Sequence, residues 1–295
     1  MAYREFDTPQ ISRRSLLRGG AWLTASAALA SVPMGRQAFA RTPAAAWTNV
    51  EAMVDKYVGS RKVANMVATL GWGQRDPLTI ARGTLALGGP TKVDPDSLYR
   101  IYSMTKPVTG MAAMMLVDEG RLGLDQPIAE LLPAYANIQV QKTYDGSIED
   151  VVPAERPITV RHLLTHTAGL GYGIVQKGPI TKAYEQRGLV PGQVSRMPIP
   201  GIGRAQAVEG LDVFADRLAE LPLVLQPGTK WSYSVGLDLM GRVIEVASGM
   251  AFDAFLKERI FEPTGMDSTF FTVPESEVDR FTTNYGILNN TPLPI

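Results

Sequence analysis

A serine and a lysine three positions apart are the first residues of this chain with catalytic potential. Ser103-Met104-Thr105-Lys106 follows an extended stretch, Ser97 to Tyr102, and opens a predicted helix that runs to Glu119. Residues three apart share one face of a helix, so the Lys106 amine can approach the Ser103 hydroxyl. A serine hydroxyl needs an adjacent base, and a lysine becomes a base where burial or nearby cations lower its pKa. The spacing therefore indicates nucleophilic acyl transfer at a helix start, where free backbone N–H groups can face an oxyanion.

Two further segments follow this pair in a recognisable order. They are Ile158-Thr159-Val160-Arg161-His162-Leu163-Leu164-Thr165-His166-Thr167-Ala168-Gly169-Leu170 and Gln226-Pro227-Gly228-Thr229-Lys230-Trp231-Ser232-Tyr233-Ser234, with shorter matches at 120–125 and 261–266. Together the three motifs resemble the β-lactamase-related serine hydrolase family. That family includes class C β-lactamases, D-alanyl-D-alanine peptidases and lipase-like esterases. The resemblance extends over residues 50 to 285.

The resemblance implies a covalent serine ester with Ser103, Lys106 and Tyr233 as the catalytic residues. Ser103 would attack the substrate carbonyl after losing its proton to Lys106 and Tyr233, and Tyr233 would pass a proton to the leaving group. A tyrosine is protonated at neutral pH unless a cation lies close, and Lys106 is the candidate cation. A buried aromatic with a satisfied hydroxyl is the alternative interpretation of Tyr233. Tyr135-Ala136-Asn137 has the letters of the class C tyrosine motif, but it lacks the Pro-Gly-Thr lead-in and is rejected.

One departure from the family pattern concerns the substrate. Val235 stands where β-lactamases and peptidases of the family carry an asparagine that holds the lysine and the substrate amide. The loss of that amide favours carboxylic ester hydrolysis over β-lactam or D-Ala-D-Ala cleavage. The expected partner is therefore a small acyl substrate, an ester or a β-lactam or peptidoglycan-like compound.

A second departure concerns completeness. The third family motif, K-T-G, H-x-G or W-x-G, is not found before Ile295. That motif lies on strands that supply the second oxyanion donor, and removing one such donor costs roughly a hundredfold in rate. We therefore expect a C-terminally truncated chain that is weak or inactive in this form. A non-catalytic penicillin-binding or sensor-type module that is acylated without turnover is the alternative.

The predicted fold is of the α+β class, β-lactamase-like or penicillin-binding-protein-like, with an antiparallel sheet layer and a helical region. We expect one hydrolase domain over 41–295, in which 47–100 begin the sheet layer, 101–270 are mainly helical and 271–295 begin an incomplete return to the sheet. Apolar spacing predicts a helix from Trp47 to Val58 and two antiparallel strands, Val63 to Trp72 and Leu78 to Leu87, joined by a turn at Gln74 to Pro77.

Local signals predict the helices that follow. Thr159 is a candidate cap for a helix from Val160 to about Thr167. Further helices are expected around residues 211–221, from Gly236 to Ala247 before Gly249, and around residues 252–260 before Pro263. The stretch from Gly171 to Ala205 shows no clear period and is interpreted as an irregular lid or substrate-facing insertion.

The N-terminus has the features of an export signal. Ser12-Arg13-Arg14-Ser15-Leu16-Leu17-Arg18 precedes an Ala-rich apolar run and the small-x-small site Ala38-Phe39-Ala40. This pattern resembles a twin-arginine signal over residues 1–40, which predicts a periplasmic or secreted protein. The apolar run is shorter than the roughly 20 residues of a spanning helix. No stable membrane span is therefore expected after cleavage.

The amino-acid composition argues against several other classes of protein. The 295 residues are 45% hydrophobic and 20% charged, with 29 basic and 29 acidic residues, so no net field would attract nucleic acid. There is no cysteine, which excludes a disulfide framework or a thiolate zinc site. His162 and His166, the only histidines, are four apart but lack a third ligand, so they are interpreted as packing or capping residues. Neither a metal nor a cofactor is predicted, and a Ser-His-Asp triad is disfavoured.

Overall fold

The computed structural model describes residues 47–71, 76–189, 207–288 and 291–295. The predicted export signal lies outside these residues, as do Gln74 and Arg75 of the predicted turn and residues 190–205 of the stretch predicted to be irregular. The chain forms two compact units, one up to Ser97 and one from Leu98 onward. Each unit is described by itself.

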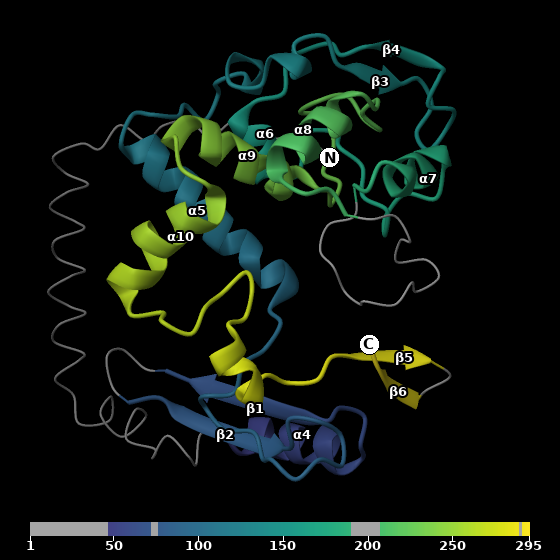
Figure 1. Ribbon diagram of the computed structural model, residues 1–295. Helices are drawn as coiled ribbons and strands as arrows, with labels where there is room; N and C mark the ends of the chain where they lie inside the picture. Colours follow the sequence, from purple (N-terminus) through teal and green to yellow (C-terminus); the bar gives the residue numbers. More distant parts are fainter. Residues whose placement is uncertain (1–46, 72–75, 190–206, 289–290) are drawn as a thin grey trace, which may run out of the picture. The chain divides into compact units, whose positions relative to one another are not determined.

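The first unit is a helix packed on a β-hairpin. Helix α4 (Thr48–Gly59) precedes strands β1 (Asn65–Leu70) and β2 (Leu78–Gly83), and the strands pair antiparallel from Asn65↔Gly83 to Leu70↔Leu78. α4 lies along one face of the hairpin (Figure 1), and its Val54 is fully buried there. These elements agree with the predicted helix and strands to within a few residues at each end.

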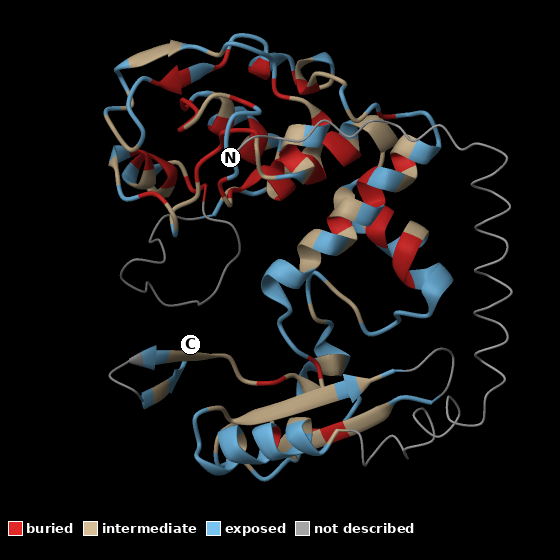
Figure 2. Cartoon of the chain, turned by 180° about the vertical axis from the view of Figure 1, so that it is seen from behind, coloured by how far each residue is buried: buried red, intermediate tan, exposed pale blue. Residues whose placement is uncertain are grey.

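The second unit is built mainly of helices. They are α5 (Thr105–Asp118), α6 (Val160–Leu164), α7 (Pro179–Gln186), α8 (Leu211–Ala219), α9 (Gly236–Ser248) and α10 (Phe252–Leu256). α9 is central, because α5, α6, α8 and α10 all pack against it. Its apolar face carries the fully buried Leu239, Met240, Val243 and Ile244, and buried residues concentrate where these helices meet (Figure 2). Together with the antiparallel hairpin of the first unit, these helices confirm the predicted α+β fold class.

Short helical turns and small strands complete this unit. The turns are η1 (Tyr102–Met104), η2 (Ile128–Glu130), η3 (Pro133–Tyr135), a π-helical turn η4 (Lys257–Phe261), η5 (Glu262–Thr264) and η6 (Glu275–Arg280). Strand β3 (Gln139–Gln141) pairs antiparallel with β4 (Val151–Pro153), and β5 (Tyr285–Leu288) pairs antiparallel with β6 (Thr291–Pro294). Within the described residues each sheet has two strands.

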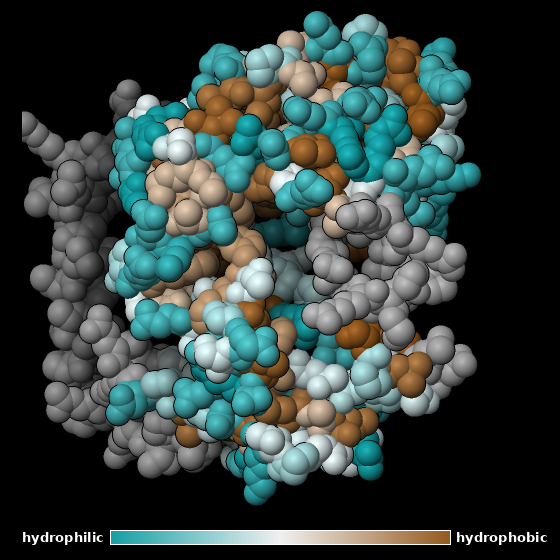
Figure 3. Space-filling view, viewed as in Figure 1, coloured by the Kyte–Doolittle hydropathy of each residue, from teal (hydrophilic) through white to brown (hydrophobic). Residues whose placement is uncertain are grey.

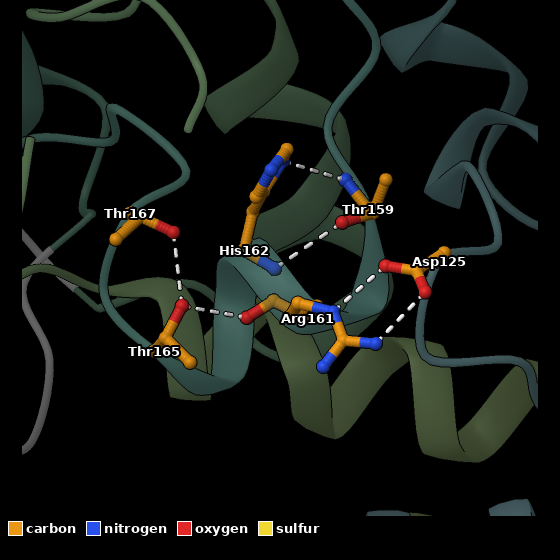
Figure 4. Close-up of polar contacts among 6 residues, drawn as sticks. All are labelled: Asp125, Thr159, Arg161, His162, Thr165 and Thr167. Atoms are coloured by element: carbon orange, nitrogen blue, oxygen red, sulfur yellow. Dashed lines mark hydrogen bonds and ion pairs between the residues drawn. The ribbon is translucent and has the colours of Figure 1, made fainter. Parts of the chain in front are cut away.

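The predicted cap of α6 is present and reciprocal. The Thr159 hydroxyl accepts the His162 N–H at 3.3 Å, and the His162 Nδ1 accepts the Thr159 N–H at 3.2 Å (Figure 4). This capping box satisfies two N–H groups that a helix start otherwise leaves free. Arg161, on the same short helix, makes two hydrogen bonds of 2.7 and 2.8 Å with the Asp125 carboxylate. The capping interpretation of His162 is therefore confirmed.

The prediction that the stretch from Gly171 to Ala205 is irregular is wrong in part, because it contains a helix. Pro179 begins α7, and Ile180, Ala183 and Tyr184 form its buried face. The spacing of these three residues is helical, but eight residues between Gly-rich segments give only a weak periodic signal. The Tyr184 hydroxyl accepts the Gly171 N–H at 3.1 Å, so α7 also fixes the backbone that leads into it.

The face drawn in Figure 3 carries both hydrophilic and hydrophobic side chains. In Figure 3 hydrophilic side chains cover much of the surface, with smaller hydrophobic patches between them. In the described part of the chain no helix combines the length and apolar character needed to cross a membrane.

Candidate active site

The extended segment before Ser103 is held by a distant part of the same unit. The Leu98 N–H donates to the Arg280 carbonyl at 2.8 Å, and the Thr282 N–H and hydroxyl donate to the Leu98 carbonyl at 2.9 and 2.8 Å. The Arg100 guanidinium lies 4.1 Å from the centre of the Phe281 ring. The approach to the serine is thus fixed by residues nearly two hundred positions away in sequence.

Ser103 lies on a tight turn and not on the α-helix predicted to begin there. It belongs to η1, and α5 begins two residues later at Thr105. Tyr102, directly before the serine, has a φ of 45°, which is unusual for a residue other than glycine. Such backbone strain clusters at functional sites, where the surrounding structure maintains it. The turn presents the Ser103 side chain at the surface of the unit.

The structure brings the three predicted site residues together. The Ser103 Oγ lies 2.7 Å from the Tyr233 hydroxyl, and the Lys106 Nζ lies 3.4 Å from the Ser103 Oγ. The Lys106 Nζ is also 5.0 Å from the centre of the Tyr233 ring. Ser103 therefore has both a hydroxyl partner and an amine partner within hydrogen-bonding range.

The Tyr233 hydroxyl is more acidic than an ordinary phenol. Partial burial by itself would raise the pKa of Tyr233, but the hydrogen bonds with Ser103 and Lys106 and the positive charge of Lys106 outweigh burial and lower that pKa. A nearby cation and donors to the charged form both favour the phenolate. The site therefore has a tyrosine whose deprotonated form is stabilised by its neighbours.

The segment that carries Tyr233 is tied by backbone hydrogen bonds to the chain after α6. The Gly228 N–H donates to the Thr167 carbonyl at 2.8 Å, and the Val235 N–H donates to the Gly171 carbonyl at 3.3 Å. Gly228 has a φ of 76°, a left-handed conformation that glycine adopts without strain. This explains physically why a glycine stands at this position before the tyrosine.

Two of the three residues, Ser103 and Lys106, border a cavity within the second unit. It has a volume of about 650 Å³, and Ser103, Lys106 and Tyr172 lie in its wall. Apolar and aromatic side chains from α8, α9, α10 and the segment after η5 complete much of that wall: Leu211, Leu237, Phe252 and Phe271. A cavity of this size accommodates a small-molecule acyl group.

Asp238 is a cavity residue that the sequence analysis missed. It lies in the first turn of α9 and lines the same cavity as Lys106. Burial raises the pKa of its carboxyl, and the charge of Lys106 partly opposes that rise. Its position five residues after Tyr233 gives it no recognisable motif, so only the packing of α9 against α5 shows that it faces Lys106.

Val235 and Tyr135, which the motif comparison singled out, are not among the residues that line the cavity. Val235 is fully buried as the residue before α9, where its apolar side chain belongs to the core. Tyr135 is also buried, and its hydroxyl donates to the Ala215 carbonyl at 2.8 Å.

The two histidines have different surroundings. His162 caps α6, whereas His166 lies beside Tyr233, with 4.8 Å between the two ring centres. Burial and the charge of Lys106 lower the pKa of His166. Among the described residues no three His, Asp or Glu side chains gather into a group that would hold a metal ion.

A serine, a lysine and a tyrosine that meet at a helix start, in a helical unit accompanied by small antiparallel sheets, define the class of β-lactamase-like serine hydrolases. The comparison with protein families gives the same class and names the family. The chain belongs to the beta-lactamase family, whose profile matches residues 50–294.

Individual relatives include esterases. Esterase EstB of Burkholderia gladioli is 30% identical over 248 residues, which are 84% of this chain and 57% of that protein. An uncharacterized protein of Mycobacterium tuberculosis (strain CDC 1551 / Oshkosh) is 38% identical over 65% of this chain and 43% of its own length. The chain thus spans about half the length of the curated relatives it matches.

The fold has matches among solved structures. EstCE1, described as a hydrolase with promiscuous acyltransferase activity, superposes with a TM-score of 0.68 and 25% identity. The match covers 84% of this chain and 58% of that one. The β-lactamase-like fold is therefore established for this chain, and the relatives of this family include esterases and hydrolases.

Proposed function

We propose that this protein is a serine hydrolase that cleaves carboxylic esters through a covalent acyl-enzyme. The observation that carries the proposal is the contact of the Ser103 Oγ with the Tyr233 hydroxyl at 2.7 Å, with the Lys106 Nζ 3.4 Å from the same oxygen. A nucleophile within reach of its base, and a base tuned by a third group, is the arrangement that nucleophilic catalysis requires.

In the proposed acylation step, the Ser103 Oγ bonds to the ester carbonyl carbon while its proton moves to Tyr233. The carbonyl oxygen becomes an oxyanion, which backbone N–H donors would stabilise. When the tetrahedral intermediate collapses, the bond to the leaving alkoxide breaks and Tyr233 returns the proton to that oxygen. Lys106 stabilises the phenolate form of Tyr233 before it takes the proton and after it returns it, because the charge of Lys106 lowers the pKa of Tyr233.

Deacylation uses the same groups in reverse. Tyr233 takes a proton from a water molecule, the water oxygen bonds to the acyl carbon, and the Ser103 Oγ leaves with the returned proton. An alcohol can replace the water, and the product is then a new ester. The description of EstCE1 as a hydrolase with promiscuous acyltransferase activity supports acyl transfer as a second reaction of this site.

An ester is favoured over a β-lactam for two reasons. Val235 is buried in the core and offers no amide to a lactam side chain. The esterase relative EstB matches 84% of this chain. β-Lactam recognition depends on a donor and acceptor pair that an apolar side chain does not supply.

The proposal is tested with three reagents on the purified chain: p-nitrophenyl butyrate, a fluorescent fluorophosphonate and a fluorescent penicillin. We expect ester turnover and fluorophosphonate labelling, both lost in Ser103→Ala. Tyr233→Phe should lower kcat by about 10²- to 10⁴-fold with an unchanged melting temperature, because it removes only the proton-transfer hydroxyl.

Each alternative has its own result. Penicillin labelling that persists without ester turnover would identify the acylated sensor module. Complete absence of Ser103-dependent ester turnover and of Ser103-dependent labelling by the fluorophosphonate and the penicillin would overturn the acyl-enzyme itself. Acyl transfer is measured by adding benzyl alcohol, where formation of benzyl butyrate by the wild type and not by Ser103→Ala supports it.

A further inference from the structure

His166 follows Thr165, the C-cap of α6, and both its backbone and its ring contact the segment that carries Tyr233. Its φ is 55°, and its N–H donates to the Leu163 carbonyl at 3.3 Å. The predicted extension of α6 to Thr167 is therefore wrong, because the left-handed residue turns the chain out of the helix. A non-glycine residue in this region is unusual and marks a site of special constraint.

His166 makes hydrogen bonds with the residues directly before and after Tyr233. The His166 carbonyl accepts the Ser232 N–H at 2.9 Å, and the His166 Nδ1 accepts the Ser234 N–H at 3.2 Å. The Ser234 Oγ is also 3.2 Å from that Nδ1 and itself accepts the Gly236 N–H at 3.2 Å. The residues immediately before and after Tyr233 are thus both held by one histidine.

This arrangement fixes the protonation state of the ring. A backbone N–H only donates, so the Nδ1 that receives the Ser234 N–H must carry a free lone pair. The proton of a neutral ring is then on Nε2. The charged group that faces the ring is Lys106 on α5, and the Tyr233 ring lies against it from the segment before α9.

We propose that His166, in its neutral form, is a positioning residue that sets the distance between the Tyr233 hydroxyl and Ser103. The inference rests on the proposed ester hydrolysis and adds a residue to it. A misplacement of about 1 Å in a catalytic group can reduce a rate 10²-fold. A residue that holds Ser232 through its backbone carbonyl and Ser234 through its ring controls that distance directly.

The test compares His166→Leu with His166→Asn. Asparagine tolerates a left-handed φ, and its Oδ1 occupies a position close to that of Nδ1, so it can accept the Ser234 N–H. We expect His166→Leu to lower kcat for p-nitrophenyl butyrate by about 10- to 100-fold with little change in KM, and His166→Asn to restore most of it. Equal losses in the two variants, or none in His166→Leu, would overturn the proposal.

His162→Leu is the matched control, because the His162 Nδ1 also accepts a backbone N–H, but that N–H belongs to Thr159 and not to a residue next to Tyr233. It should lower the unfolding temperature and leave kcat unchanged. A loss of kcat equal to that of His166→Leu would show a general effect of destabilising α6.

The pH profile gives a second readout that a structural role would not change. Protonation of His166 removes the acceptor for Ser234 and places a second cation beside Lys106, so kcat of the wild type should fall as the solution is acidified. Asparagine does not titrate, so His166→Asn should keep only the fall that protonation of Tyr233 causes and should lack the part that protonation of His166 adds. Persistence of the same acid limb in His166→Asn would count against the role of His166.

A third readout does not need turnover. The ultraviolet absorbance of tyrosinate, corrected by Tyr233→Phe, reports the ionisation of Tyr233, which should shift to higher pH in His166→Leu as the contacts with Ser103 and Lys106 loosen. An unchanged titration contradicts the positioning role even if the wild type lacks esterase activity. An inactive wild type with the expected shift would instead refute the proposed function alone.

Discussion

Lys106 contacts both of the hydroxyl groups that the proposed reaction needs. Its Nζ is 3.4 Å from the Ser103 Oγ, and its charge and hydrogen bond lower the pKa of Tyr233. One cation therefore orients the nucleophile and acidifies the base. This double contact explains why a lysine three residues after the serine is useful even though the serine's closest partner is the tyrosine.

Replacement of Lys106 gives a prediction with a defined sign. In Lys106→Met, the two contributions of Lys106 that lower the pKa of Tyr233 disappear, while burial still raises it. The pKa of Tyr233 should therefore move upward, toward or past the ordinary value of about 10. Spectroscopic titration of tyrosinate, with Tyr233→Phe subtracted, measures the shift.

The control for this titration is Lys142→Met. The Lys142 amine lies 3.7 Å from the Asp150 carboxylate and does not line the cavity. The titration of Tyr233 should be unchanged in this variant. A shift of the same size in both variants would mean that the effect of Lys106 is not local.

At the scale of elements, the site depends on how closely the chain after α6 approaches the segment before Tyr233. Gly169 has a φ of 80°, and the Val224 N–H donates to its carbonyl at 2.8 Å. A Cβ atom on Gly169 would lie 2.0 Å from the Leu225 carbonyl oxygen, so the two segments meet at backbone distance. No side chain fits at this point without separating them.

Gly169→Ala should therefore be strongly destabilising. The left-handed φ alone costs about 1 to 2 kcal/mol for a non-glycine residue, and the clash with Leu225 adds to that cost. Gly249→Ala is the matched control, because Gly249 has a φ of 72° but nothing within 4 Å of its added Cβ. Urea unfolding of the two variants should show the larger loss for Gly169→Ala, and equal losses would contradict the close approach.

At the scale of the whole molecule, any preference for substrates of one charge must come from the charged groups in the cavity wall. The chain carries 29 basic and 29 acidic residues, so no net field attracts or repels a charged substrate. The cavity wall is different, because it combines Lys106 with three carboxylates, Asp238, Glu245 and Asp253. Glu245 is paired with Arg242 at 2.9 Å, whereas Asp238 faces Lys106 without a salt bridge to it among the described contacts.

This charge distribution predicts discrimination among esters. p-Nitrophenyl esters of 6-aminohexanoic, heptanoic and adipic acid present a cationic, neutral or anionic end on chains of similar length. Asp238→Asn should raise kcat/KM for the adipate monoester and lower it for the amine, relative to heptanoate. A change of about 1 to 2 kcal/mol corresponds to roughly five- to thirtyfold.

Asp267→Asn removes the same charge from an exposed position that does not line the cavity, and it should leave these ratios unchanged. If Asp238→Asn also leaves them unchanged, Asp238 has no part in selecting the substrate by charge.

The sequence by itself determined the parts of this protein that depend on neighbours along the chain. The cap at Thr159, the left-handed stop at Gly249 and the approach of Lys106 to Ser103 all act within one helical turn, so their spacing is enough to predict them. Three motifs in order were also enough to place the chain in its family and in the α+β class. The short helix α7 was missed because its few apolar residues carry too little periodic signal.

Only the tertiary structure decided how the site is assembled. Ser103 and Tyr233 are 130 residues apart in sequence, and their 2.7 Å contact results from the packing of α5, α6 and α9 in one core. The left-handed backbone at Tyr102 and His166 has no signal in residue type, because neither tyrosine nor histidine requires it. Asp238 faces Lys106 only because α9 packs against α5. Long-range packing fixes these features, and local propensity does not encode them.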